Sequence, residues 1–166
     1  MNNLALTKLS YGLYVITTWA DGKATGCTAN SAFQVTSSPA TIAISINHEN
    51  YTNECIKNNG MFAISVLGEN SDPMIIGNFG FKSGKDTDKF ASNPPIIKNF
   101  MPIVNGAISY ITCKVIDSME TSTHTIFVGE ITDADIIDNS ATPMTYAYYH
   151  NVIKGKAPKK APTYIE

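Results

Sequence analysis

The chain has 166 residues, of which 43% are hydrophobic and 16% charged, and its formal net charge at pH 7 is -2. This length predicts a single domain, residues 1–166, whose core is large enough to fold without disulfides or metal. The small share of charged residues excludes a highly charged disordered chain, and the near-neutral balance argues against a nucleic-acid partner bound through a basic face.

The first half of the chain shows the two-residue alternation typical of half-buried strands. Tyr14 to Trp19 runs into Asp21-Gly22, a hairpin signal, so the second strand of the hairpin is expected over about Lys23 to Val35. Thr41 to Ile46 places three isoleucines on one face. Met61 to Leu67 repeats that pattern.

Further strands are predicted over Ile108–Ile116, Thr125–Ile131 and Thr145–Tyr149, which are rich in β-branched and aromatic residues. Short helices are predicted over Asn50–Asn58 and from Asp72-Pro73 onward, where capping residues precede an apolar turn. Residues 77–105 have little periodicity and are expected to form one long functional loop. Residues 154–166 are rich in proline and lysine and are expected to lie extended over a surface.

About six antiparallel strands with a few short helices favour a mainly β fold, an antiparallel β-barrel that is closed or partly closed. Strands alternating with helices of ten or more residues, the pattern of a parallel sheet, are missing. A dinucleotide site of the parallel-sheet type is therefore excluded.

Every basic residue is a lysine, so a phosphate site in this chain must use ammonium groups, hydroxyls and backbone N–H groups in place of guanidinium. Cys27, Cys55 and Cys113 are odd in number and have no metal-ligand spacing, which fits a reducing compartment. The sequence has neither a membrane-length apolar run nor the apolar stretch of a signal peptide near its start. A cytoplasmic protein without a membrane partner is expected.

The segment Gly26 to Ser31 carries small and hydroxyl-bearing residues where a core strand would have bulky ones. Glycine within a strand often marks the close approach of a ligand. Thr28, Asn30 and Ser31 offer donors and acceptors for a planar heterocycle with amide edges. A bulged edge strand with turn-forming polar residues explains the same pattern.

Two further segments could bind a phosphate. A predicted strand ends near Asn47 and a helix begins near Thr52, whose free N–H groups attract anions, although simple helix capping accounts for these residues too. The loop Phe79 to Phe90 interleaves lysines with glycines and phenylalanines. Its glycine spacing is wrong for a P-loop, and a solvated loop is the alternative.

The three histidines differ in their surroundings. His124 lies at a predicted strand start among hydroxyl residues, where it can contact a cofactor or move a proton near neutral pH. His150 closes an aromatic cluster, and His48 lies in a turn. No pair of them has zinc-ligand spacing, so no metal is expected.

Several of these stretches, taken together and in order, resemble the flavin reductase-like, FMN-binding split-barrel family, and within it flavoredoxin and the flavin domain of high-molecular-weight rubredoxin. The stretches are Tyr11–Thr18, Gly26–Ser31, Phe79–Phe90, His124–Glu130 and Met144–Tyr164. The family often has aspartate before the histidine and arginine at the phosphate, whereas this chain has Thr123 and only lysines. The resemblance implies a split β-barrel that holds FMN noncovalently near the interface of a homodimer.

The resemblance also assigns residues to the FMN. The isoalloxazine ring is lined by Thr28, Ala29, Asn30 and Ser31; the ribityl chain or phosphate is faced by Ser45, Asn47 and Thr52; the phosphate is contacted by Lys82, Ser83, Lys85 and Lys89; and the pocket is closed by the cluster from Tyr148 to His150. His124 is placed beside the ring as the catalytic residue for the reaction with nicotinamide.

The activity implied is an NAD(P)H:flavin oxidoreductase that passes electrons from NADH or NADPH through FMN to an acceptor. A flavoredoxin-type electron carrier, reduced by a protein donor such as rubredoxin or ferredoxin, is the alternative, and a rubredoxin-like or other redox protein is expected as a partner in that case. A flavin-free split-barrel binding module is a third interpretation.

Overall fold

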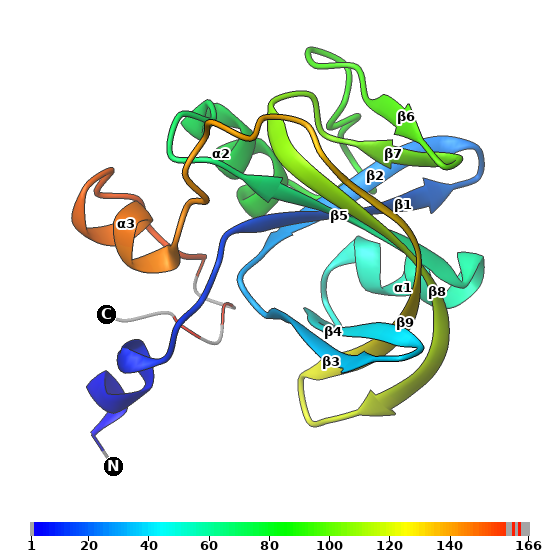
Figure 1. Ribbon diagram of the computed structural model, residues 1–166, viewed down its shortest axis with the longest axis horizontal. Coiled ribbons are helices and arrows are strands. Elements are labelled where there is room, and N and C mark those ends of the chain that lie inside the picture. Colours follow the sequence, from blue (N-terminus) through cyan, green and yellow to red (C-terminus); the bar gives the residue numbers. More distant parts are fainter. Residues whose placement is uncertain (1, 159–160, 162, 164–166) are drawn as a thin grey trace.

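The computed structural model describes residues 2–158, 161 and 163. The described chain begins with a 3-10 helix, Asn3–Lys8, followed by the strands and α-helices shown in Figure 1. Their bounds in chain order are β1 Tyr14–Ala20, β2 Lys23–Ala29, β3 Ala32–Ser37, β4 Ala40–Asn47, α1 Tyr51–Asn59, β5 Met61–Leu67, α2 Pro73–Phe81, β6 Ile96–Lys98, β7 Met101–Ile103, β8 Ala107–Glu120, β9 His124–Ile136 and α3 Tyr146–Asn151.

Seven antiparallel strands form one curved sheet in the order β2-β1-β5-β8-β9-β4-β3, and β6 pairs with β7 apart from it. The two edge strands, β2 and β3, are consecutive in the chain and joined by only Asn30 and Ser31. A link of two residues can span at most about 10 Å. The two edges of the sheet must therefore lie close together at this point. The backbone N–H of Ser45 also donates to the carbonyl of Ser31, at 3.2 Å. The sheet is therefore a barrel that is split between β2 and β3, as expected for the fold class.

The strands bury side chains on both faces, because the barrel has its own interior and is also covered outside. Inside, Ile16 packs with isoleucines of β4 and with Phe62 and Phe127. Outside, the neighbouring residue Val15 packs with Ile76 and Phe79 of α2. Successive side chains of β1 therefore point alternately into the inner core and into the outer core. Those in the outer core pack against α2, which lies outside the barrel beside the split.

Helix α1 is held against the barrel by a buried amide and by Ile56, which packs in the inner core. Asn53 is 2% exposed, and its Nδ2 donates to the carbonyl of Ile46 in β4 and to Oγ1 of Thr125 in β9, both at 2.9 Å. The N-terminus of α1 is therefore held at a defined place next to the ends of β4 and β9. Among the described residues, no helix has the length and apolar character needed to cross a membrane.

The prediction of a strand over Thr145–Tyr149 is wrong, because residues 146–151 form the helix α3. Aromatic residues favour strands on average, but here Oγ1 of Thr145 caps the helix by accepting from the N–H of Tyr148 at 3.0 Å. Burial of Tyr149 against the outer core completes the helix. Local capping and tertiary packing outweigh the strand preference.

Two other boundaries differ from the prediction. The second strand of the first hairpin does not run to Val35, because the chain leaves the sheet at Asn30 and Ser31 and begins β3 at the opposite edge. Residues 77–105 do not form one loop, since they contain the end of α2 and the hairpin of β6 and β7. The remaining predicted strands and both predicted helices are present, and Oδ1 of Asp72 caps α2 at 2.9 Å as its position suggested.

Candidate functional site

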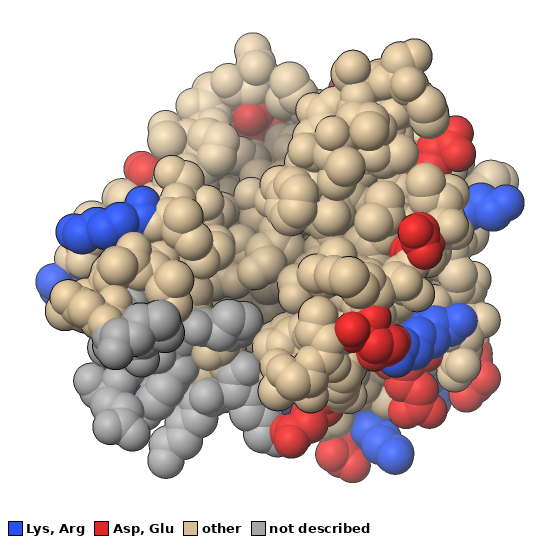
Figure 2. Space-filling model, turned by 90° about the horizontal axis from the view of Figure 1, so that it is seen from below, with Lys and Arg blue, Asp and Glu red and all other residues tan. Residues whose placement is uncertain are grey.

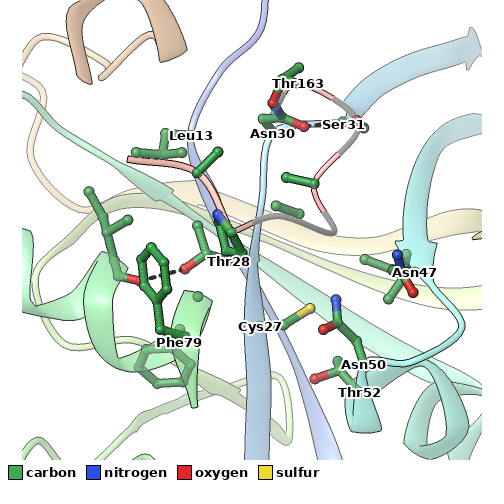
Figure 3. Close-up of a pocket in the computed structure, with 18 of the residues that line it drawn as sticks. Leu13, Cys27, Thr28, Asn30, Ser31, Asn47, Asn50, Thr52, Phe79 and Thr163 are labelled. Carbon is green, nitrogen blue, oxygen red and sulfur yellow. Dashed lines mark hydrogen bonds between the residues drawn. The ribbon is translucent and has the colours of Figure 1, made fainter. Parts of the chain in front are cut away.

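A cavity of about 630 Å³ opens where β2 and β3 diverge. Its walls come from the end of β2, the end of β4, the N-terminus of α1, the end of α2 with the loop after it, and the segment that follows α3. Figure 3 shows Asn30 and Ser31 toward one end of it, Asn50 and Thr52 toward the other, and Thr28 between them. On the face of the molecule in Figure 2 uncharged residues predominate, and charged side chains lie mostly toward the edges.

Most residues that the sequence analysis selected line this cavity. They are Thr28, Ala29, Asn30, Ser31, Ser45, Asn47, Thr52, Lys82, Ser83, Lys89 and His124. They come from five separate parts of the chain, so only the tertiary structure brings them together. Lys85, Tyr148 and His150 are not among the residues that line it.

Other lining residues were missed by the sequence analysis. Tyr146 lines the cavity although it was not selected, and Tyr149 is the member of the predicted cluster from Tyr148 to His150 that lines it. The cause is the wrong secondary structure: residues three apart share a face of a helix, whereas residues two apart share a face of a strand. Recognising Thr145 as a helix cap would have selected the correct pair.

One end of the cavity is built to receive an anion. The side chain of Asn50, the residue before α1, makes no capping hydrogen bond, so it leaves N–H groups of the first helical turn without a side-chain cap. Thr52 in that turn is 2% exposed and its side chain hydrogen-bonds with the Cys27 thiol. Lys82 and Ser83 line the same cavity from the loop after α2, and the neighbouring Gly84 lies close to Tyr51 at the start of α1. The helix dipole, a hydroxyl group and a lysine therefore converge, which is a suitable set for a phosphate in a chain without arginine.

The loop after α2 packs closely against β2 at Gly84, whereas Gly80 in α2 makes only an ordinary contact with the same strand. A Cβ atom on Gly84 would collide with the Oγ1 of Thr25, and one on Gly80 would lie 3.6 Å from the side chain of Thr28. The loop therefore approaches the strand more tightly than residues with side chains allow at Gly84. This approach shapes the cavity wall that carries Lys82 and Ser83.

Lys89 is buried, with 4% of its surface exposed, although its side chain is cationic. Its Nζ donates to the carbonyl of Gly26 at 2.7 Å and to that of Phe79 at 3.1 Å, and lies 5.7 Å from the centre of the Phe79 ring. Burial lowers the pKa of Lys89. Neither ion pair found among the described residues includes Lys89, so its charge is balanced only by carbonyl dipoles there. This lysine ties the loop to β2 and α2 and places a positive charge in the cavity wall.

The other end of the cavity has a small, polar wall from β2. Oγ1 of Thr28 donates to the carbonyl of Ile76 at 3.3 Å, and Oγ of Ser31 donates to Oδ1 of Asn30 at 3.0 Å. Burial raises the pKa of the Cys27 thiol, which therefore stays protonated and unreactive at neutral pH. A flat heterocycle can lie against this wall and exchange hydrogen bonds with its side chains.

His124 lies at the start of β9 with its ring only partly buried. Oγ1 of Thr123 and Nδ1 of His124 are 2.8 Å apart and share a hydrogen bond. Burial lowers the pKa of His124, and the nearby charge of His48 lowers it further. His124 is therefore neutral at pH 7. In the neutral form the imidazole can make hydrogen bonds but adds no charge to the cavity.

The chain is similar to proteins of known type along most of its length. Residues 6–155 match the family described as flavin reductase like domain. "High molecular weight rubredoxin" of Moorella thermoacetica is 43% identical over 166 residues, covering 99% of this chain and 72% of the relative. "Ferric-chelate reductase (NAD(P)H)" of Archaeoglobus fulgidus is 40% identical over 164 residues, covering 98% and 96%. The solved structure of flavin reductase PheA2 superposes with a TM-score of 0.74 at 26% identity, covering 87% of this chain and 92% of that one.

Proposed function

The chain belongs to the flavin reductase like domain family, and we propose that the cavity in the barrel's split holds FMN while electrons pass from NAD(P)H to an acceptor. The protein is an NAD(P)H:flavin oxidoreductase of this family. The observation that carries the assignment of the site is the cavity itself, which joins an uncapped helix N-terminus to a small polar wall.

The residues present fit the two ends of FMN. The first-turn N–H groups of α1, Thr52, Ser83 and Lys82 would hold the phosphate, with the charge of Lys89 behind them. Ser45 and Asn47, at the end of β4, would face the ribityl chain between the two ends. FMN would be held noncovalently by these contacts, and burial raises the pKa of Cys27, the cysteine among the lining residues.

The ring would lie against residues 28–31. When bound, FMN supplies the chemistry of accepting a hydride and passing electrons onward, and the protein supplies binding and orientation. Thr28, Asn30 and Ser31 would position the ring edge by hydrogen bonds, and the apolar side chains of Leu13 and Phe79 would exclude water from the same cavity. Hydride transfer requires close, aligned approach of the nicotinamide more than it requires an acid or a base.

His124 would contact the nicotinamide rather than transfer a proton to it. The imidazole is neutral, and Thr123 engages its Nδ1 while Nε2 remains for a partner. A neutral imidazole provides one hydrogen bond and a flat surface, which help to orient an amide-bearing ring. No side chain of the cavity is indispensable to the chemical step in this mechanism.

A second copy of the chain would cover β3. This edge strand is exposed along nearly its whole length and carries Phe33 and Val35, 64% and 49% exposed. Ile116 and Met119 of β8 are also more than half exposed. Exposed apolar residues on an edge strand favour association, so we assign these strands to a homodimer interface that brings the flavin site near its partner.

The cytoplasm is the proposed location. Its support is that Cys27, Cys55 and Cys113 are all free thiols, as in a reducing compartment.

A protein donor is the second candidate source of electrons. The similarity to a relative named a rubredoxin supports it. In that case the flavin site accepts electrons from a small redox protein such as a rubredoxin or ferredoxin, and nicotinamide reacts slowly.

The test begins with the purified full chain and its absorbance spectrum. The protein is expected to bind FMN with the bands of a flavin, and anaerobic addition of NADH is expected to bleach them within the time of turnover. If the flavin bands are bleached by reduced rubredoxin but not by NADH, the electron-carrier function replaces the reductase function. A chain that binds no flavin, even when FMN is added, would overturn both and support a binding module.

A further inference from the structure

The described chain begins with an arm, residues 2–10, that contains the 3-10 helix Asn3–Lys8. Oδ1 of Asn2 accepts from the N–H of Leu4 at 3.1 Å, so the helix has its own cap. All residues from 4 to 10 are exposed, and Figure 1 shows the helix beside the marked N-terminus, apart from the strands of the barrel. The arm is therefore a formed element with little cover from its own chain.

Three leucines give the arm an apolar surface. Leu4, Leu6 and Leu9 are 57%, 48% and 58% exposed. Residues three apart lie on the same side of a 3-10 helix, so Leu6 and Leu9 face the same way. Helices this short gain most of their stability by packing an apolar side against another surface. The structure of one chain leaves that side of the arm uncovered.

The arm leaves the barrel from a fixed point. The N–H of Tyr146 donates to the carbonyl of Tyr11 at 2.9 Å, and the N–H of Leu67 donates to the carbonyl of Leu13 at 3.2 Å. Leu13 is 2% exposed, so the change from a covered to an exposed chain takes place within three residues of Ser10. From this root, a chain of nine residues that includes one short helix reaches about 20 Å, enough to contact a second molecule beside the barrel.

The outer face of β3, β4, β9 and β8 is a second uncovered apolar surface, which we call the outer sheet face. Residues opposite each other in neighbouring strands share a face, and the register places Ala43 between Phe33 and Val128. Phe127, next to Val128, packs in the inner core, so this row points outward. Met119 of β8 pairs with the residue two before Val128 and shares the same face. Phe33 and Met119 are 64% and 57% exposed.

The arm and the outer sheet face carry opposite charge. Lys8 is the only charged residue of the arm. Residues 115–138, which include the end of β8 and all of β9, carry six acidic residues and no lysine. One of them, Asp117, is exposed and lies opposite Val128 in the outer sheet face. This difference in charge favours an arm against a sheet face over contacts between two arms or between two sheet faces.

We propose that the arm of one copy of the chain docks on the outer sheet face of a second copy, with Leu6 and Leu9 packed near Phe33. The proposal rests on the homodimer of the proposed function, in which β3 meets a second copy, and it adds the segment that covers this strand. In a two-fold dimer each arm meets the sheet of the other copy, so the contact is made twice. Lys8 of each copy then approaches Asp117 of the other.

Sedimentation equilibrium of the full chain measures the dissociation constant of the dimer. The variant Leu6→Gln/Leu9→Gln keeps the length and helix propensity of the side chains but removes their apolar surface. It is expected to raise the dissociation constant at least about tenfold, because each dimer loses four buried leucines. Ala5→Gln/Ser10→Gln changes two other exposed positions of the same arm and is expected to keep the dissociation constant of the original chain.

A cross-link between two different chains tests where the arm docks. Equal amounts of the Leu9→Cys and Phe33→Cys variants are mixed and treated with a short bis-maleimide, and a linked pair with one chain of each kind is expected. The native cysteines are buried, so they do not compete. The matched control replaces Phe33→Cys by Phe100→Cys, since Phe100 is 85% exposed in the turn of the separate β6–β7 sheet. This mixture should give no linked pair.

The outcomes separate the arm from the dimer itself. If the original chain is a monomer, the proposed homodimer fails and the arm proposal fails with it. If the original chain is a dimer and Leu6→Gln/Leu9→Gln leaves its dissociation constant unchanged, the arm proposal fails alone. A weakened dimer with no link between Leu9→Cys and Phe33→Cys would place the arm on another surface and overturn the proposal. A link that forms only when one chain carries both cysteines would show that the arm folds back on its own barrel, and this result overturns the proposal too.

Discussion

His124 lies directly opposite Asn47 in the antiparallel pairing of β4 with β9, and both side chains line the same cavity. The main-chain ladder, and not the imidazole, holds His124 in this place. The side chain can therefore be removed without moving the strand. This makes its contribution to nicotinamide recognition separable from its position in the fold.

The variant His124→Ala is expected to lower kcat/KM for NADH roughly tenfold, the loss of one hydrogen bond of about 1.4 kcal/mol. FMN affinity is expected to stay nearly the same, because the phosphate end of the cavity is unchanged. Stopped-flow reduction and FMN titration measure the two effects. His48→Ala is the control: His48 is not among the lining residues and pairs with Glu120 at 2.8 Å, so this variant removes the charge that lowers the pKa of His124 but keeps the imidazole of His124. Equal loss of both properties in His124→Ala would contradict its assigned role.

The glycine at position 84 is expected to be required for FMN binding. In Gly84→Ala the new Cβ collides with Oγ1 of the buried Thr25 and comes within 3.4 Å of the Tyr51 ring, so we expect the loop bearing Lys82 and Ser83 to shift. FMN affinity should fall at least tenfold, about 1.4 kcal/mol, when measured by titration. Gly77→Ala is the matched control, because a Cβ there meets no atom within 4 Å and alanine favours the helix. Equally weakened FMN binding in Gly84→Ala and Gly77→Ala would contradict this prediction.

Lys89 is expected to make FMN binding depend on pH. Burial lowers its pKa, so the folded chain holds this proton less tightly than the unfolded chain does, and by this effect alone stability rises as the pH increases through the lowered pKa. A bound phosphate favours the protonated ammonium. FMN affinity is therefore greatest below the lowered pKa of Lys89 and falls as the pH rises through it.

Titrations of FMN at neutral and alkaline pH test this prediction. Lys89→Met is expected to bind FMN more weakly and with less dependence on pH. It is also expected to be less stable, by about 1–3 kcal/mol, because the carbonyls of Gly26 and Phe79 lose their partner. Lys85→Met, a change outside the cavity, should keep the pH profile of the original chain. A profile that survives in Lys89→Met would exclude this lysine as its source.

Association through β3 is expected to fail when its apolar surface is charged. Phe33→Glu places a carboxylate on the exposed edge strand, and burying that charge in an interface is costly. The variant should elute as a monomer in size-exclusion chromatography with light scattering. Phe100→Glu is the control, since Phe100 is 85% exposed in the turn between β6 and β7. A dimer that survives Phe33→Glu would place the interface elsewhere.

The secondary structure could be predicted where one local signal acted alone. Alternation of isoleucines along Thr41–Ile46 and the cap at Asp72-Pro73 each led to an element that is present as β4 and α2. The prediction failed at Thr145–Tyr149, where the aromatic composition favoured a strand and the cap favoured a helix. The outer core that buries Tyr149 decided between these signals, and the local sequence does not contain it.

The candidate site could be predicted in part. Segments rich in small and hydroxyl residues, such as Gly26 to Ser31, were selected because such residues are unusual within a strand. The sequence could not show that Lys89 is buried under two carbonyls while Lys85 lies outside the cavity, since both belong to the same loop. The spacing of lysines in this loop does not distinguish a lysine that is buried from one that lies outside the cavity.

By itself, the sequence determined the strand-rich character of the protein and the absence of arginine, and it predicted which segments would bind a nucleotide. These are properties of composition and of neighbouring residues, which act over a few positions. Only the tertiary structure decided that β2 and β3, adjacent in the chain, lie at opposite edges of one curved sheet, and that described residues after α3 line the cavity at this split. Those relationships arise from packing between residues far apart in the chain, and no local pattern encodes them.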